Sequence, residues 1–252
     1  MIASERFEKI LAMVDENGIM DIKKLAKKLQ VTEMTIRRDC EALEKEGKLI
    51  RVRGGAKSVN KRTILSNRDE KKMSDRTEHY HEKDIVCERA ASFVKEGDCV
   101  FIDGGTSVVP LVKYLKGKKV KIVTHSLLAA NAFDDEESEL FLIGGKYIPE
   151  YNMSVGPITL ANLEKFNFDH AFIGCAGADI ERNLIYTAEL ETMAVKDKVM
   201  KLAVKKYLLI DASKLNVKGF YSFIDCTGFD AVICNDDIKI NKEELPENFI
   251  LV

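Results

Sequence analysis

The chain has 252 residues, 46% hydrophobic and 32% charged, which is enough for one small and one medium domain, each with its own core. No apolar run reaches the ~20 residues that cross a bilayer, and the charged opening segment 1–10 does not resemble a signal peptide. These observations exclude a membrane protein and predict a cytoplasmic one. The net charge of −2 conceals an asymmetry, because residues 1–76 hold 19 Lys and Arg against 13 Asp and Glu, and the rest hold 20 against 28. A basic head on an acidic body is typical of DNA binding, although a solvated basic surface gives the same counts.

The six cysteines give no sign of a disulfide framework or a zinc site. No two of them form a C-x-x-C pair, and the four histidines lack zinc-finger spacing. Most of the cysteines lie within apolar or helical patterns, which favours buried thiols in a reducing compartment. We therefore expect neither a metal nor a cofactor.

Three short helices are predicted in the first 47 residues, because apolar side chains recur there every three or four positions. The stripes are Phe7, Ile10, Leu11 and Val14, then Ile22, Leu25, Ala26 and Leu29, then Ile36, Cys40 and Leu43. Asp21 and Thr32 are expected to cap the second and third helices, and Gly47 to follow the third. Residues 49–55 then indicate a short β-hairpin, or wing, with a glycine turn.

Helices of this length, joined by a tight turn, fit a helix-turn-helix over residues 1–57. If Ile36 faces the core, polar side chains remain outside at the amino end of the third helix, the end that enters the major groove of DNA. Arginine pairs with guanine or phosphate, and threonine with phosphate or a thymine methyl. The alternative is a small helical domain whose arginines form a solvated face. The predicted DNA contacts are Thr32, Thr35, Arg37 and Arg38 on the helix, and Arg51 and Arg53 on the wing.

Residues 58–78 are polar and rich in both charges, and are interpreted as a linker. From residue 79 to 252, strand-like and helix-like segments alternate, which predicts an α/β domain with a largely parallel, Rossmann-like sheet. The expected strands are 99–103, 121–124, 140–143, 171–174, 207–211, 231–234 and 249–252. A long helix is expected over residues 190–205, and shorter ones follow the first three strands.

The first of these strands runs into a loop, Asp103-Gly104-Gly105-Thr106-Ser107, that is predicted to bind an anion. Glycines let the backbone approach a ligand, and free N–H groups with two hydroxyls favour a phosphate. The loop matches neither the Walker nor the dinucleotide pattern, and an ordinary glycine turn remains the alternative. Other polar or glycine-rich strand ends, at 124–126, 144–145, 174 and 211, are expected at the same edge of the sheet.

The stretch VTEMTIRRDCEALEKEG at residues 31–47, followed by RVRGGA at 51–56, strongly resembles the DeoR family of transcriptional regulators. That family's pattern is V-S-x-x-T-I-R-R-D-L-x-x-L-E-x-x-G and then R-x-x-G-G-A. This chain departs from it at Thr32, usually Ser, and at Cys40, usually Leu.

The C-terminal part also resembles the DeoR-type sensor domain, which is similar in fold to ribose-5-phosphate isomerase. The resemblance rests on the 103–107 loop, on Thr124-His125-Ser126 (family T-N-S) and on Asp211-Ala212-Ser213-Lys214 (family D-x-S-K). It also rests on Gly144-Gly145, Phe172-Ile173-Gly174, and Glu191 with Lys196. It implies that Gly105, Thr106 and Ser107 hold the phosphate of a sugar. It further implies that the sugar lies near Thr124, Ser126, Gly145, Asp179, Glu191 and Lys214. His125 departs from the family's Asn.

The resemblance implies a repressor of carbohydrate metabolism genes that binds an operator in double-stranded DNA and is controlled by a phosphorylated sugar. Two-fold symmetric operators lead us to expect a homo-oligomer, a dimer or a tetramer. The rival is a sugar-phosphate isomerase with Asp179, Glu191 and Lys214 as its machinery. The isomerase D-G-A-D motif appears here as Ala176-Gly177-Ala178-Asp179, without its first Asp, so we expect no catalytic residue. A scaffold protein, the third option, would leave the recognition helix and the phosphate-type loop unexplained.

Overall fold

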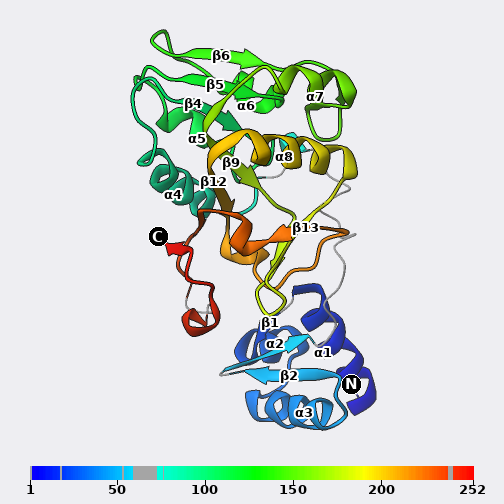
Figure 1. Ribbon diagram of the computed structural model, residues 1–252. Helices are drawn as coiled ribbons and strands as arrows, with labels where there is room; N and C mark the ends of the chain where they lie inside the picture. The colour runs from blue at the N-terminus through cyan, green and yellow to red at the C-terminus, as the bar shows by residue number, and fades with distance from the viewer. Residues whose placement is uncertain (1, 18, 53, 59–72, 76, 238–240) are drawn as a thin grey trace. The chain divides into compact units, whose positions relative to one another are not determined.

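The computed structural model describes residues 2–17, 19–52, 54–58, 73–75, 77–237 and 241–252. The chain divides into two compact units, Met1–Arg62 and Thr63–Val252, each with its own hydrophobic core (Figure 1). Within the described residues, no helix is both long enough and apolar enough to cross a membrane. Most of the predicted linker lies outside the described residues, so its bounds remain a prediction.

The N-terminal unit packs three helices against a small antiparallel sheet, ordered β1-β3-β2. The elements are α1 (Ala3–Asn17), β1 (Ile19–Asp21), α2 (Ile22–Leu29), α3 (Glu33–Lys45), β2 (Leu49–Val52) and β3 (Gly55–Ser58). The three apolar stripes supply most of its core, and the fully buried members include Ile10, Leu25, Ile36 and Leu43. The predicted helix-turn-helix and wing are therefore present, and the strand β1, absent from the prediction, pairs with the wing.

Local hydrogen bonds place the helix ends where the sequence predicts them. The carboxylate of Asp21 accepts the backbone N–H of Lys23 at 2.7 Å, and the hydroxyl of Thr32 accepts that of Thr35 at 3.2 Å. Gly47, just past α3, has φ of +69°, a left-handed conformation that suits glycine. Gly54, at φ +81°, makes the turn between β2 and β3.

The C-terminal unit contains a seven-stranded parallel sheet with the order β15-β14-β12-β9-β4-β5-β6. The strands are β4 (Cys99–Ile102), β5 (Lys121–Thr124), β6 (Glu139–Leu142), β9 (Phe168–Gly174), β12 (Ala203–Ile210), β14 (Ala231–Cys234) and β15 (Phe249–Leu251). The predicted α/β class is confirmed. The chain winds outward from β4 to β6 and returns to β9 beside β4, so the direction of winding reverses between β4 and β9.

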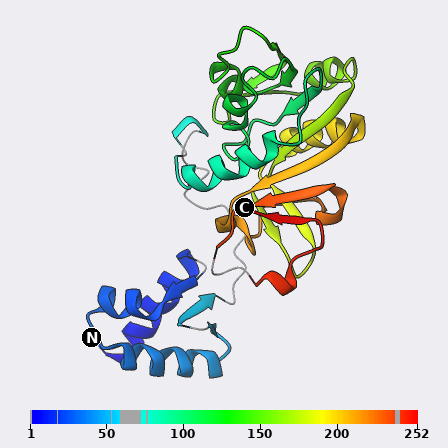
Figure 2. The ribbon, with the colours of Figure 1, turned by 90° about the vertical axis from the view of Figure 1, so that its left-hand side faces the viewer.

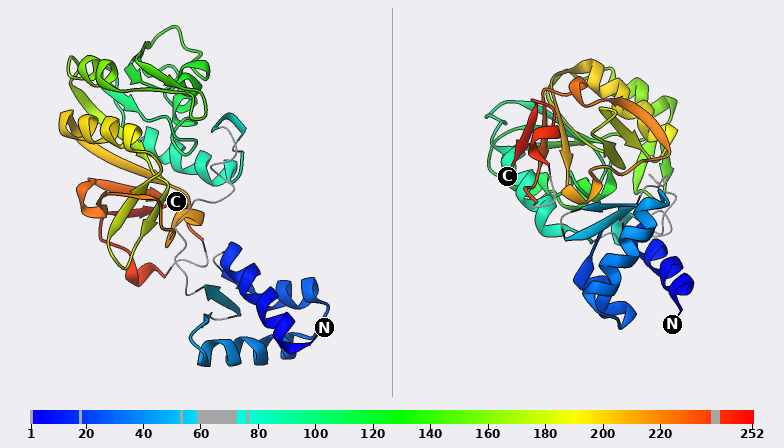
Figure 3. Two further views of the ribbon diagram at one scale, coloured as in Figure 1. Left: turned by 90° about the vertical axis from the view of Figure 1, so that its right-hand side faces the viewer. Right: turned by 90° about the horizontal axis from the view of Figure 1, so that it is seen from below.

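Helices cover both faces of this sheet, as Figures 2 and 3 show. Strand side chains alternate between the two resulting cores: Phe101 packs on the side of α7 and α8, whereas Val100 and Ile102 pack on the side of α4 and α5. The helices are α4 (Tyr80–Ala91), α5 (Leu111–Tyr114), α6 (Leu127–Asn131), α7 (Pro157–Leu163) and α8 (Leu190–Leu202).

Two features of this unit differ from the sequence prediction. The helix expected over 190–205 ends at Leu202, and β12 begins at once with Ala203, because the following residues pair with β9. Small antiparallel elements that the sequence analysis missed lie outside the main sheet. They are the pair β7 (Lys146–Ile148) and β8 (Met153–Val155), and the sheet of β10 (Gly177–Asp179), β11 (Leu184–Thr187) and β13 (Tyr221–Asp225). Strands of three to five residues carry too little alternation to stand out in a sequence.

Candidate functional site

The amino end of α3 presents the side chains that were predicted to contact DNA. Thr32 caps the helix, and its hydroxyl lies 2.9 Å from that of Thr35. Ile36 is fully buried, which turns Arg37 and Arg38 to the surface. Arg37 is only loosely paired, 3.8 Å from an exposed carboxylate on the preceding turn. All four side chains lie in the first turns of α3 and none of them is buried; together they are called the surface on α3.

The sequence analysis missed Met34 on the same surface. Its side chain is 74% exposed, which is unusual for an apolar residue and would suit contact with a thymine methyl group. An apolar residue that falls off the buried stripe of a helix, between Thr32 and Thr35, is the signal that could have identified it.

Of the two arginines predicted to contact DNA from the wing, Arg51 is paired with a glutamate of α3. The Nε of Arg51 donates to the carboxylate of Glu44 at 2.8 Å, and the same carboxylate accepts the backbone N–H of Arg51 at 2.8 Å. The guanidinium is therefore held against α3 by its Nε, while its terminal nitrogens remain available to a phosphate. Arg53 lies outside the described residues.

In the C-terminal unit, the loops that follow β4 and β9 meet at the point where the winding of the sheet reverses, the usual place for a ligand in an open α/β fold. A cavity of about 110 Å³ opens there. Gly105 and Thr106 line it from the first loop, and Gly174, Cys175 and Ala176 from the second. Its other polar lining residues are Glu78, His79, Lys83, Tyr151, Thr187, Thr192, Lys196, Asp211 and Lys214.

Two lysines, from different parts of the fold, donate hydrogen bonds to the loop after β4. The ammonium of Lys83, on α4, donates to the hydroxyl of Thr106 at 3.1 Å and to the carbonyl of Glu78 at 2.6 Å. The ammonium of Lys214 donates to the hydroxyl of Ser107 at 2.7 Å and to the carbonyl of Cys175 at 3.1 Å. Two positive charges therefore lie beside the hydroxyls of one short loop. This arrangement favours the binding of an anion.

Beneath this loop, Asp103 is fully buried and saturated with donors. It accepts the backbone N–H of Gly104 at 2.8 Å and that of Gly174 at 2.9 Å, and it is paired with the ammonium of Lys196. The Nε2 of His125 lies 3.3 Å from its Oδ1. Burial alone would raise the pKa of Asp103, but Lys196 and His125 lower it well below its usual range. Asp103 is therefore an ionised carboxylate that supports the loop without lining the cavity.

Asp211 faces the cavity from the end of β12. It is 1% exposed, and its Oδ1 accepts the hydroxyl of Ser213. Its Oδ2 accepts no hydrogen bond within the described part of the chain, and the nearest cation is the ammonium of Lys214 at 3.7 Å. Although burial raises its pKa, Lys214 and Ser213 lower the pKa of Asp211 overall, so it is an acceptor for a donor that enters the cavity.

The structure brings only part of the predicted ligand site together. Gly105, Thr106 and Lys214 line the cavity, with Asp103 and Ser107 directly behind them. Gly104 packs against β8, where an added Cβ would lie within 3 Å of the side chain of Met153. A turn follows Gly105, and the helix after the loop begins only at Leu111. The predicted free amides of a helix start are therefore not next to the loop, and the lysines and hydroxyls are its main anion-binding groups.

The other predicted ligand residues have structural contacts and do not line the cavity. Thr124 donates to the carbonyl of Ile102 at 2.7 Å, Ser126 caps α6, and Gly145 leaves room for Thr159. Asp179 is buried on β10, where it accepts a backbone N–H at 3.2 Å, and Glu191 pairs with Lys146 at the surface. Their assignment to the sugar remains a prediction that the geometry of the cavity does not support.

Lys83 and Lys196 were missing from the predicted site, yet the sequence held a signal for both. Each lies within the buried stripe of its helix, Lys83 ahead of Val86 and Ala90, and Lys196 beside Val195. A lysine on an apolar stripe must find a buried partner, because an unpaired ammonium is costly in the interior. Such a residue is therefore a candidate for a binding site.

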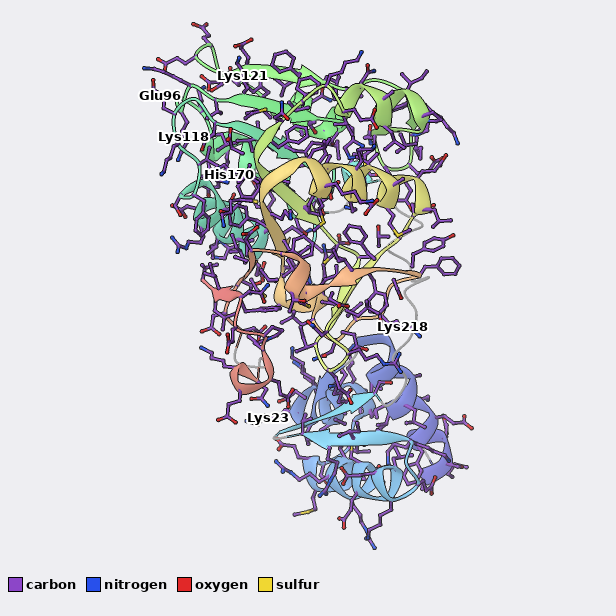
Figure 4. All side chains as sticks on the ribbon, in the orientation of Figure 1. Lys23, Glu96, Lys118, Lys121, His170 and Lys218 are labelled. Carbon is purple, nitrogen blue, oxygen red and sulfur yellow. The ribbon has the colours of Figure 1, made fainter. Side chains whose placement is uncertain are left out.

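The opposite edge of the sheet, where the strands begin, is also charged, but its groups serve the fold. Glu96, Lys118, Lys121 and His170 mark this edge in Figure 4. Lys118 donates to two backbone carbonyls near the end of α4, and the Nε2 of His170 lies 3.0 Å from the carboxylate of Asp98. No group of three potential metal ligands occurs among the described residues.

Two family models match this chain. The DeoR-like helix-turn-helix domain matches residues 6–62, and the DeoR C terminal sensor domain matches residues 78–236, more than half of the chain. The chain belongs to the DeoR family of transcriptional regulators. The surface on α3 thus lies in the helix-turn-helix of a DeoR regulator, and the cavity lies in its sensor domain.

Curated relatives of this DeoR-family chain match it over nearly their whole length. The lactose phosphotransferase system repressor of Streptococcus mutans is 32% identical, over 96% of this chain and 96% of that protein. The corresponding repressor of Lactococcus lactis is 32% identical over 95% and 93%, and the HTH-type transcriptional repressor GlcR of Bacillus subtilis is 30% identical over 92% and 88%.

Solved structures similar to this DeoR-family chain include the expected isomerase. Ribose 5-phosphate isomerase A from Neisseria gonorrhoeae is 18% identical, with a TM-score of 0.36 over 53% of this chain and 52% of that one. The eIF2B beta structure from Chaetomium thermophilum is 12% identical, with a TM-score of 0.41 over 61% and 48%. Scores of this size support no argument about function.

Proposed function

We propose that this DeoR regulator represses carbohydrate metabolism genes and that a phosphorylated sugar, bound in the sensor cavity, controls its affinity for DNA. The observation that carries the proposal is the convergence of Lys83 and Lys214 on the hydroxyls of Thr106 and Ser107 at the wall of a cavity. The names of the relatives, repressors of a sugar phosphotransferase system among them, support the same class of gene.

In this proposal the phosphate binds at the 105–107 loop, where Thr106 and the two ammonium groups donate to its oxygens. Lys83 and Lys214 exchange the carbonyl groups they now contact for the ligand. The sugar extends toward Asp211, whose free Oδ2 accepts one of its hydroxyl groups. A neutral sugar lacks the charge that the loop is built to bind, so the proposal predicts preference for the phosphorylated form.

DNA binding is assigned to the amino end of α3. Thr32, Thr35, Arg37 and Arg38 would enter the major groove, and Arg51 and Arg53 would contact the backbone from the wing. One chain carries one such helix, so a two-fold symmetric operator calls for a dimer or a tetramer. The protein would act in the cytoplasm, the compartment that contains both DNA and phosphorylated sugars.

Ligand control requires the ligand to favour one of two states that differ in DNA affinity. The cavity is close in sequence to the segment that links the two units. Met73, Glu78 and His79 line the cavity, and they follow shortly after residues 59–72, which lead from one unit to the other along the chain. A ligand that takes Lys83 away from the carbonyl of Glu78 changes the contacts of this segment. We propose that this exchange starts the response.

We propose further that the sensor has no enzymatic activity. A sugar-phosphate isomerase needs a free carboxylate base near the carbon skeleton. Here Ala176 stands where the isomerase motif has its first Asp, and Asp179 does not line the cavity. Asp211 does line it, but its lowered pKa makes this carboxylate a weak base. Turnover of pentose or hexose phosphates by the purified protein, lost in Asp179→Ala, would contradict this.

The test is a thermal-shift screen of sugar phosphates against their free sugars. A ligand at ~100 times its Kd stabilises the folded state by about 2.7 kcal/mol, well within reach of the method. Stabilisation by one or a few phosphorylated sugars alone supports the sensor. A gel shift then compares Thr106→Arg, expected to keep DNA binding and lose the ligand response, with Thr106→Ser, which keeps the hydroxyl. A ligand response retained in Thr106→Arg would show that the phosphate site is misplaced.

A further inference from the structure

His125 replaces the family's Asn at the end of β5, and its ring joins two parts of the ligand site. The side chain is fully buried and stacks on Phe101 with ring centroids 5.9 Å apart. Its Nδ1 lies 2.8 Å from the backbone carbonyl of Ser154 on β8, and its Nε2 lies 3.3 Å from Oδ1 of Asp103. The backbone carbonyl of His125 also accepts the N–H of Ser154 at 2.8 Å.

Both ring nitrogens therefore face oxygen atoms that can only accept. A carbonyl has no proton to give. Asp103 has none either, because its two oxygens already accept N–H groups from Gly104, Gly174 and Lys196. A neutral imidazole has one N–H and one lone pair, so either tautomer would point a lone pair at an oxygen. Only the doubly protonated ring donates on both sides.

We propose that His125 is a buried imidazolium that positions the ligand site, its two N–H groups tying Asp103 beneath the phosphate loop to the strand that carries Met153 into the cavity wall. The charged groups facing it are Asp103 from β4 and, through that carboxylate, Lys196 from α8. On β8 its described partner is the backbone carbonyl of Ser154, and on β4 it also stacks on the ring of Phe101. An Asn at this position would bring one amide group and no charge.

The imidazolium leaves the buried cluster with a surplus of positive charge. One carboxylate, Asp103, serves two cations, Lys196 and His125, and uncompensated charge in the interior is costly. An anion in the adjacent cavity reduces that cost, since Lys196 also lines the cavity. This consequence for binding rests on the proposed function, whereas the charge of the ring does not.

The charge is tested directly by nitrogen NMR of the full chain labelled with ¹⁵N-histidine, with His125→Asn to assign the resonances. The spectra are recorded at about pH 7.5, where an ordinary histidine is mostly neutral. Both ring nitrogens of His125 are expected to bear protons at that pH. One unprotonated ring nitrogen would overturn the proposal. If His125→Asn does not fold, His125→Gln makes the assignment.

The functional consequence is tested by calorimetric titration with sulfate, a dianion whose charge does not change near neutral pH. We expect His125→Asn to bind sulfate about tenfold more weakly, the size of one modest charge interaction. His81→Gln is the matched control, because His81 is exposed and does not line the cavity, so affinity is expected to change by less than about twofold. Equal affinity in wild type and His125→Asn would overturn the role in binding. Absence of sulfate binding in wild type would contradict the proposed phosphate site, while NMR still decides the charge.

Discussion

The surface on α3 and the sensor site hold their charged side chains in opposite ways. In the N-terminal unit, Arg37 and Arg38 are exposed over an apolar core. In the C-terminal unit, Asp103, Lys196 and Lys83 are buried within the fold itself. An exposed charge is free for a partner and contributes little to folding, whereas a buried charge must be paired and its loss destabilises the protein. The comparison teaches which residues can be altered without unfolding the chain.

The largest effect is expected for Asp103→Ala in the sensor. Removing this carboxylate leaves Lys196 and His125 buried without their partner, which costs about 3–5 kcal/mol of unfolding free energy. Urea unfolding measures it. The matched control is Asp197→Ala, on the same helix as Lys196, whose exposed pair with Lys201 should contribute no more than about 0.5 kcal/mol. Equal losses in the two variants would contradict the contrast between buried and exposed charge.

The same carboxylate should also contribute to the pH dependence of the unfolding free energy in acid. The pKa of Asp103 is lowered in the folded state, so its contribution is fully present above the unfolded-state value, about 3.9. That contribution is lost as the pH falls from there toward the lower folded-state pKa. Unfolding free energies measured between about pH 5 and pH 3 should fall less steeply in Asp103→Asn than in wild type. Parallel slopes would show that Asp103 is not the responsible group.

The N-terminal unit also contains a largely buried ion pair, and it sharpens the comparison. Arg6 on α1 and Asp39 on α3 form a two-bond ion pair, with side chains 14% and 7% exposed. Asp39→Ala should destabilise this unit by about 2 kcal/mol, because hydrogen bonds to charged groups are among the stronger ones. Glu33→Ala, which removes only the loose surface partner of Arg37, is the control and should change unfolding by less than about 0.5 kcal/mol.

Arg38→Ala should weaken DNA binding by about 1–3 kcal/mol while leaving the unfolding midpoint unchanged. Fluorescence anisotropy measures this with a duplex that the wild-type protein selects from a random pool. The salt dependence distinguishes the kind of contact, since loss of a phosphate contact lowers its slope by about one. Unchanged affinity would remove Arg38 from the proposed interface.

The smallest effect is expected at the cap of α3. Thr32→Ala removes the hydroxyl that accepts the N–H of Thr35, which should cost about 1 kcal/mol in thermal or urea unfolding. Thr32→Ser is the control. It keeps the capping oxygen and should be nearly neutral.

Much of the fold could be predicted from the sequence. Stripes such as Ile36, Cys40 and Leu43 indicated the helices, and Asp21, Thr32 and Gly47 marked their ends, because these signals act within one turn of chain. Alternation of apolar strands with helices indicated the parallel sheet. The Gly105-Thr106 loop was also predicted as a ligand site, since a glycine loop after a buried strand is a local pattern.

The rest of the cavity could be placed only by the tertiary structure. Lys83 reaches Thr106 across 23 residues, Lys214 reaches Ser107 across 107, and Lys196 reaches Asp103 across 93. Glu191 and Asp179, expected there by resemblance, do not line it. The sequence by itself determined the helices, their caps and the class of fold, because those depend on neighbours along the chain. Which charges share the cavity depends on how strands distant in sequence come to lie side by side, and only the packed sheet decides that.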